Sequence, residues 1–233
     1  LERFPWVVQG TTSRGPAEEP FDLGLFSSGS TEQAVRRHWD RLLRHTSAAR
    51  AVHSQQVHGS IVRVHHSDDS QGPVLQLVDA CDGHATACPD ALLAVTVADC
   101  VPVFIVDERH RAVAAIHAGW RGAAAGVLEQ GLEAMGGAFG TVAAEVYLHF
   151  GPSICGGCYE VGPEVFDALC QPVPSGPAPI DLRVVLAGRA TDAGVGVDRI
   201  SISEHCTRCT ESGLFSHRAG DLQRQVGYMG VRA

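Results

Sequence analysis

The sequence lacks an apolar run long enough to cross a bilayer. Its longest apolar stretch, Ala91 to Val106, is interrupted by Asp99, whereas a membrane-spanning helix needs about 20 predominantly apolar residues. Residues 1–10 also lack the basic segment and apolar core of a secretory signal. We therefore expect a cytoplasmic protein with no membrane partner.

Positive charge is scarce, with 18 Lys and Arg against 26 Asp and Glu and a net charge of −8 at pH 7. The resulting negative field repels nucleic acid and anionic lipid. We therefore expect a small-molecule substrate and no nucleic-acid partner. The eight cysteines are expected to be thiols or metal ligands in a reducing compartment, because disulfides are rare there.

Repeats and linker-like tracts are also absent, so the simplest expectation is a single domain over residues 1–233, as a monomer or homodimer. Apolar spacing predicts a helix over residues 31–45, opened by a capping box from Ser30 to Gln33. Short apolar runs predict three central strands, at Ala91–Val97, Val101–Val106 and Ala112–His117.

The second half of the chain continues this alternation of helices and strands. A helix is expected over Trp120–Met135, weakened by Gly131. Further expectations are a strand over residues 145–150, a helix opening at Pro163, a loop over 171–180, a helix over 181–193 stopped by Gly194, and an edge strand from Gly227. The predicted fold class is α+β, with mixed β-sheets packed together and helices on the outside.

Three segments place a metal-ligand side chain at the end of a strand: Gln56–Gly59 with His58, Ala98–Pro102 with Cys100, and His117–Gly122 with His117. Two imidazoles and a thiolate form a set typical of catalytic zinc, in which a fourth position stays open. Their separations of 42 and 17 residues match no local zinc motif. On spacing alone, hydrogen-bonded histidines and a buried, inert cysteine are the favoured interpretation.

The order of the motifs is more specific than their spacing. QVHG, ADCVPV, HAGWRG followed by GAAAGVLE, GPSI with CYEVG, and the late CTRC and LFSHR segments follow one another along nearly the whole chain. Together they resemble the laccase-domain, or polyphenol-oxidase-like, family. Members of that family are described as purine nucleoside phosphorylases with adenosine deaminase activity, and a bacterial branch is named peptidoglycan editing factor.

The resemblance implies a metal site and a substrate. It carries the metal ligands over to His58, Cys100 and His117, with Zn²⁺ as the expected ion and Cu²⁺ as the alternative. It implies a purine nucleoside and phosphate as substrates. Copper-dependent phenol oxidation and hydrolysis of a peptidoglycan precursor remain alternative functions, and a metal-stabilised binding module is the non-enzyme alternative.

Other site residues are expected from the same motifs. Asp82 and Cys100 are the expected catalytic residues, and Asp82 is expected either to orient a metal-bound histidine or to accept a proton. Arg14, Arg121 and Glu160 are the expected substrate-binding residues. Arg121 follows Gly119 at a helix N-terminus, where an anion is favoured. Each of these residues also has a competing interpretation. Arg14 is then part of a surface salt bridge, the glycines near Arg121 serve only helix packing, and Glu160 is only a charge at a helix start.

Two CxxC pairs, Cys155 with Cys158 and Cys206 with Cys209, raise the alternative of a second, closed Cys₄ zinc site. The 47 intervening residues exceed the usual ribbon spacing, so packed thiols are the competing interpretation.

Some patterns argue against related enzymes. There is no His-x-Glu followed by Pro-Cys-x-x-Cys, as in cytidine deaminases, and no His-x-His of a true multicopper laccase. Residues 216–219 and 227–229 also differ from the Arg-rich endings common in the family, which puts substrate preference in doubt.

Overall fold

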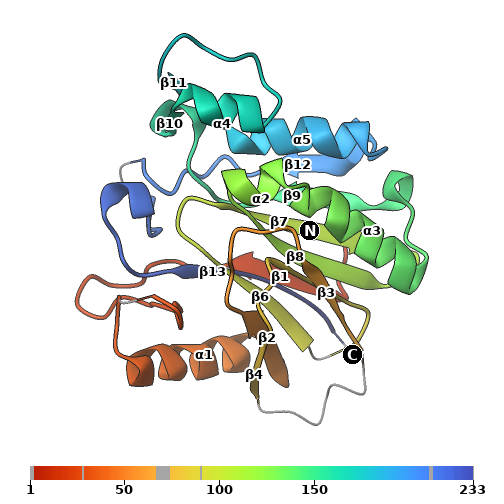
Figure 1. Ribbon diagram of the computed structural model, residues 1–233. Helices are drawn as coiled ribbons and strands as arrows, with labels where there is room; N and C mark the ends of the chain where they lie inside the picture. The colour runs from red at the N-terminus through yellow and green to blue at the C-terminus, as the bar shows by residue number, and fades with distance from the viewer. Residues whose placement is uncertain (1–2, 28, 67–73, 90, 210–211, 233) are drawn as a thin grey trace.

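Two mixed β-sheets lie face to face in the computed structural model, which describes residues 3–27, 29–66, 74–89, 91–209 and 212–232 (Figure 1). The first sheet has five strands in the order β1 (Val7–Thr11), β13 (Gln225–Val231), β6 (Ala91–Val97), β2 (Arg50–Ser54) and β4 (Leu75–Val78). The second has six, in the order β12 (Ile200–Ile202), β9 (Tyr147–Phe150), β7 (Val101–Asp107), β8 (Ala112–Ala118), β5 (Gly83–Thr86) and β3 (Val62–His65).

The helices cover the outer faces of the sheets (Figure 1). Helix α1 (Glu32–Thr46) lies on the five-stranded sheet. The six-stranded sheet is covered by α3 (Val127–Phe139) and α5 (Leu182–Asp192). Helices α2 (Trp120–Ala124) and α4 (Pro163–Ala168) lie at the same side as α5, next to a two-stranded sheet of β10 (Glu160–Val161) and β11 (Ala178–Pro179). The predicted α+β fold class, with packed mixed sheets and outer helices, is confirmed.

Successive side chains of a strand point to opposite faces of the sheet, so a single strand can contribute to two apolar layers. On β8, Val113 and Ala115 face Leu93 and Met229 of the other sheet. The intervening residues on β8, including Ile116, pack instead against α3 and α5. A third cluster places Trp39 of α1 on the outer face of the five-stranded sheet. The chain is thus layered as helix, sheet, sheet, helix.

Several predicted elements are confirmed with small shifts. The first helix begins at Glu32, capped by Thr31 rather than Ser30, with the Thr31 hydroxyl accepting from the Ala34 amide at 3.4 Å. Helix α4 opens at Pro163, and α5 is capped by Asp181 and followed by Gly194. The predicted loop over residues 171–180 contains only the two-residue strand β11.

The prediction of one helix over Trp120–Met135 is wrong. The segment forms two helices, α2 and α3, separated at Gly126, whose φ of +80° lies in the left-handed region that favours glycine. Gly131 does not weaken the packing of α3. Its missing side chain lets the helix approach Ile116 closely, because a Cβ there would collide with that side chain.

The C-terminal strand was expected at a sheet edge, and this prediction is also wrong. Strand β13 lies inside the five-stranded sheet, paired antiparallel with β6 on one side and with β1 on the other. The pairing partner β1 comes from the start of the chain, so local sequence around Gly227 carries no sign of it.

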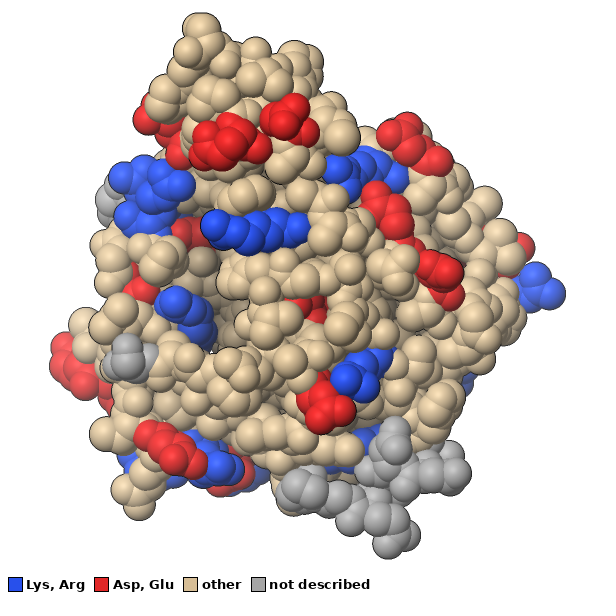
Figure 2. All heavy atoms as spheres, in the orientation of Figure 1, with Lys and Arg blue, Asp and Glu red and all other residues tan. Residues whose placement is uncertain are grey.

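Charged side chains of both signs are interspersed on the face shown in Figure 2. Among the described residues, no helix combines the length and apolar character needed to cross a membrane. The cytoplasmic location stays a prediction.

Candidate metal centre

His58, Cys100 and His117 converge, with their ligand atoms all within 4.8 Å of one another. Strands β7 and β8 form an antiparallel pair in which Val101 lies opposite Ala118. Because this register places the start of β7 beside the end of β8, Cys100 and His117 become neighbours. His58 reaches them from the loop between β2 and β3, and its ring lies edge-on to that of His117, with centroids 4.8 Å apart.

Asp82 holds two of these three residues in place. Its carboxylate is fully buried, and Oδ1 lies 2.9 Å from Nδ1 of His117. The same carboxylate accepts hydrogen bonds from the backbone amides of Val57, His58 and Gly59, at 3.3, 2.9 and 2.8 Å. With Nδ1 of His117 bound to Asp82, Nε2 is the ring nitrogen that faces the other ligands, which is how carboxylates orient metal-bound histidines.

The two neighbouring histidines favour the thiolate form of Cys100, which is the form that binds a metal ion. Burial raises the pKa of Cys100, but His117 and His58 outweigh burial and lower that pKa to about 6. Burial lowers the pKa of His117, but Cys100 and Asp82 outweigh it and raise that pKa to about 9. Burial likewise opposes ionisation of Asp82, whose pKa is nevertheless lowered by its hydrogen bonds to His117 and to backbone amides. At neutral pH, Cys100 is therefore a thiolate beside a protonated His117.

The backbone around the ligands leaves room for an ion. A Cβ on Gly119 would lie 2.9 Å from Cδ2 of His58 and 3.0 Å from Sγ of Cys100, so only glycine fits without displacing a ligand. His58 and Asp99 adopt positive φ values of 59° and 87°. Such conformations cost about 1–3 kcal/mol and concentrate at functional sites. The donor types, the fixed imidazole and the missing side chain at position 119 all fit a metal ion.

Two adjoining pockets meet at these ligands. One, of about 360 Å³, lies on the side of Phe26, Thr96 and Arg224, and the other, of about 380 Å³, lies on the side of Arg121, Tyr159 and Arg218. Both are lined by His58, Cys100 and His217. Volumes of roughly 300–1,000 Å³ are typical of small-molecule sites, so the centre has space for a substrate on either side.

The three expected substrate-binding residues occupy different positions. Arg121 lines the second pocket, with its guanidinium 4.3 Å from the ring centroid of Trp120. Arg14 is paired with Asp221 at 2.7 Å and stacks over Phe215, and the residues lining the two pockets do not include it. Glu160 is exposed and contributes its backbone oxygen, which accepts from Arg218 at 2.9 Å. Substrate binding by Arg14, Arg121 and Glu160 stays a prediction.

Sequence reasoning missed several residues that line the pockets, among them Tyr159, His217 and Arg218. Burial raises the pKa of Tyr159 to about 12, so its phenol is protonated at neutral pH. Arg218 stacks over the Tyr159 ring at 5.2 Å from its centroid, and its backbone amide donates to Asp99 at 2.7 Å. For His217 and Arg218, the sequence held a usable indication in the segment LFSHR. This segment differs from the family pattern but keeps one arginine beside a histidine.

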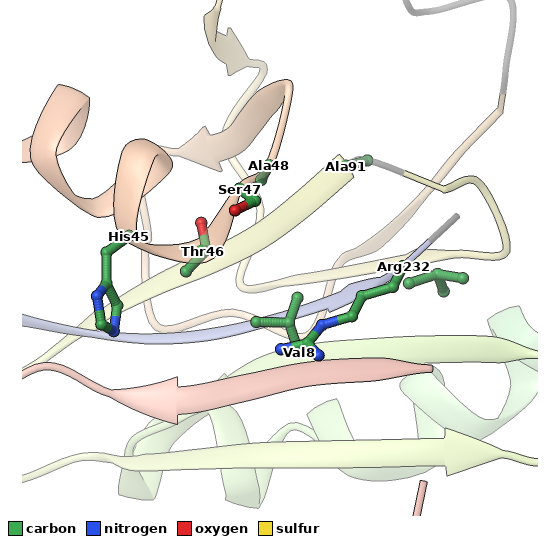
Figure 3. Close-up of a pocket in the computed structure, with 8 residues that line it drawn as sticks. Val8, His45, Thr46, Ser47, Ala48, Ala91 and Arg232 are labelled. Carbon is green, nitrogen blue, oxygen red and sulfur yellow. The ribbon is translucent and has the colours of Figure 1, made fainter. Parts of the chain in front are cut away.

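A separate hollow of about 420 Å³ lies between the end of α1 and strands β1, β6 and β13 (Figure 3). His45 and Arg232 are among its lining residues, and none of the predicted site residues is. The predicted metal ligands therefore lie at the two pockets described above and not at this hollow.

Comparisons with known proteins identify the family of this chain. The model of the family described as multi-copper polyphenol oxidoreductase laccase matches residues 7–232. The chain is 33% identical to purine nucleoside phosphorylase YlmD of Geobacillus stearothermophilus, over 98% of this chain and 92% of that protein. It is 35% identical to adenosine deaminase RL5 from an unknown prokaryotic organism, over 70% of this chain and 65% of that protein. The crystal structure of YlmD from G. stearothermophilus superposes with a TM-score of 0.92 at 27% identity, covering 100% of this chain and 94% of that chain.

Proposed function

The chain belongs to the multi-copper polyphenol oxidoreductase laccase family, and we propose that it is a zinc-dependent purine nucleoside phosphorylase that also deaminates adenosine. The observation that carries the proposal is the open set of His58, Cys100 and His117 between two pockets. Two nitrogens and one sulfur match a catalytic zinc site with an open fourth position. The names of two relatives, purine nucleoside phosphorylase YlmD and adenosine deaminase RL5, support the reaction types.

Zinc in such a set supplies Lewis acidity toward water or a phosphate oxygen at neutral pH. The remaining tasks fall to the chain's own side chains. Asp82 keeps the His117 ring oriented, and Gly119 keeps the space beside His58 and Cys100 open. Fixed orientation lowers the reorganisation that a reaction would otherwise need.

We assign phosphate to the pocket that contains Arg121, His217 and Arg218. The sequence has no lysine, so its cationic side chains are arginine and histidine. A guanidinium presents a planar fork of N–H donors that suits phosphate oxygens. One N–H group of Arg218 is already held by the Glu160 oxygen, which fixes the direction of the others. The protonated Tyr159 phenol can add a neutral donor.

We assign the purine nucleoside to the pocket that contains Phe26. This ring is 54% exposed although it is a large apolar side chain, and it lines the pocket. An exposed aromatic ring offers a stacking surface for a base. In phosphorolysis the bond from ribose C1′ to the base nitrogen breaks, a phosphate oxygen bonds to C1′, and the base leaves with a proton. In deamination water adds at C6 and ammonia leaves.

The test follows adenosine by chromatography with purified protein, with and without inorganic phosphate. Phosphate should yield adenine and ribose 1-phosphate, whereas inosine and ammonia should form without it. Replacing Cys100→Ser should abolish both products, while Cys170→Ser, at an exposed cysteine, serves as the matched control. If wild-type protein loaded with zinc leaves every purine nucleoside unchanged, the proposal fails.

Copper-dependent phenol oxidation is the second candidate. It is favoured by the description of the matched family and by the His₂Cys donor set, which is also suited to copper. Oxygen uptake with a phenol only after copper loading, without any change in adenosine, would select it. Hydrolysis of a peptidoglycan precursor stays a prediction.

A further inference from the structure

A second group of four ligand side chains lies outside the proposed active site. Cys155, Cys158, Cys206 and Cys209 place their sulfur atoms within 4.8 Å of one another. We infer that these four cysteines form a closed structural zinc site. The inference does not depend on the proposed enzyme activity.

The sulfur spacing fits one tetrahedral ion. Zn–S bonds of about 2.3 Å at a tetrahedral centre place the sulfurs roughly 3.8 Å apart. Sγ of Cys209 lies 3.9 Å from Sγ of Cys155 and 3.8 Å from Sγ of Cys158. These distances are far from the roughly 2.05 Å of a disulfide, and all four are free thiols.

The fold explains how pairs so distant in sequence meet. Strands β9 and β12 pair in parallel, so their C-terminal ends reach the same edge of the sheet. Cys155 follows β9 and Cys206 follows β12. The two segments are then tied by a bridge between Ser153 and Cys206, in which the Thr207 amide donates to the Ser153 oxygen at 3.1 Å.

Backbone donors surround Cys206 as they do a metal-bound thiolate. The amides of Cys155, Arg208 and Cys209 donate to its sulfur at 3.3, 3.4 and 3.4 Å. Hydrogen bonds of this kind favour the ionised form of a sulfur, and zinc binds thiolates. Thiolates at such short range repel one another unless a cation lies between them, so a bound zinc ion would stabilise the ionised form of all four sulfurs.

An ion pair braces both loops that carry the cysteines. The carboxylate of Asp181 accepts two hydrogen bonds from the Arg183 guanidinium, at 3.0 and 2.7 Å, one from the Arg183 amide at 3.0 Å and one from the Gly156 amide at 3.2 Å. Arg183 also donates to the backbone oxygens of Ser203 and His205, at 2.8 and 3.3 Å. The side chain of Arg183 is only 7% exposed. This ion pair, with its guanidinium buried, therefore connects the segments that carry both CxxC pairs.

Four protein ligands leave no open position, so the role of this ion is structural. The segment it would hold contacts the active-site region. Thr207 donates to the Asp99 carboxylate at 2.6 Å, next to Cys100, and Arg208 donates to the Cys158 oxygen at 3.1 Å. The ion would thereby secure Thr207 against Asp99, whose carboxylate also accepts from the Arg218 amide at 2.7 Å.

The first test measures zinc in the full chain by mass spectrometry after purification without chelator. Wild type should hold one more zinc per chain than Cys209→Ser, and Cys170→Ser should keep the wild-type content. Cys209 is exposed, so its replacement disturbs little packing. Equal zinc content in wild type and Cys209→Ser would overturn the inference.

A second test needs no variant. In wild-type protein the four cysteines should resist alkylation until a chelator is added, as read by peptide mass spectrometry, whereas exposed Cys170 should react in both conditions. Cobalt loading should also produce the visible bands of a tetrahedral thiolate centre. Alkylation of Cys209 as fast as Cys170 without chelator, or a disulfide among the four, would overturn the inference.

Discussion

Oδ1 of Asp82 lies 2.9 Å from Nδ1 of His117, in a carboxylate with no exposed surface. The same carboxylate binds the backbone of the loop that carries His58. One buried group therefore orients a ligand on β8 and a ligand on a loop that enters from the other sheet. Removing the charge of Asp82 should therefore weaken metal binding more than it lowers the stability of the rest of the fold.

We expect Asp82→Asn to weaken zinc affinity by about 10–100-fold, the range typical of lost carboxylate partners of metal-bound histidines. An amide offers one acceptor oxygen where Asp82 now serves four donors. Competition with a calibrated chelator measures the affinity. The matched control is Asp107→Asn, since Asp107 is also buried and bonded to a histidine but lies away from the ligands. Equal zinc affinity in the two variants would contradict this role.

Gly119→Ala should lose most of the zinc from the His58 site and the nucleoside activity with it. The added Cβ would lie about 3 Å from both His58 and Cys100. The control is Gly188→Ala in α5, where a Cβ meets nothing within 4 Å. That change should be neutral or stabilising by up to about 1 kcal/mol, as expected for glycine in a helix. A Gly119→Ala protein with full zinc content and activity would show that the site can relax.

Zinc entry at His58, Cys100 and His117 should release a proton when the pH lies between 6 and 9. The pKa of Cys100 is about 6 and that of His117 about 9, so the pair holds one proton in this window, on His117. Zinc binds neutral imidazole, so that proton must leave. Calorimetry in buffers of different ionisation enthalpy counts it, using Cys209→Ser so that only this site is filled. An affinity that does not change with pH in this window would contradict the assignment.

Stability should fall as the pH is lowered from 6.5 to about 4, partly because of His53. Burial lowers the pKa of His53 from 6.5 to about 4, so in this window the unfolded chain binds the proton and the folded chain does not. Protonation therefore favours unfolding, by up to about 3 kcal/mol once the pH is below 4. Denaturant titrations of wild type and His53→Gln measure the effect, and Gln keeps a donor for the Ala94 oxygen. The two slopes against pH should differ, with the wild type steeper.

Arg121→Ala should raise the KM for phosphate in phosphorolysis by about 10–100-fold, because a hydrogen bond to a charged group contributes roughly 1.5–3 kcal/mol. Deamination without phosphate should be nearly unchanged. Arg36→Ala, on the exposed face of α1, is the control. Equal losses in both reactions would instead indicate that Arg121 binds the nucleoside.

The predicted elements that proved right are those whose signals are local. The runs at residues 91–97, 101–106 and 112–117 became β6, β7 and β8 with shifts of at most one residue. The predicted start of α4 at Pro163 and the predicted end of α5 before Gly194 are also confirmed. Helix caps act through neighbouring backbone groups, so their signals are local. The break at Gly126 was missed, since α2 and α3 share an apolar face and only a positive φ separates them.

The sequence by itself determined the alternation of strands and helices, the choice of His58, Cys100 and His117, and the family resemblance. The alternation depends on side-chain chemistry and short spacings, whereas the three ligands were singled out by the order of the family motifs and not by their own spacing. The tertiary structure alone decided that β13 lies between β1 and β6, that Arg14 pairs with Asp221, and that the two CxxC pairs meet. Strand pairing between distant segments depends on how the whole sheet closes, and this information is absent from any short stretch of chain.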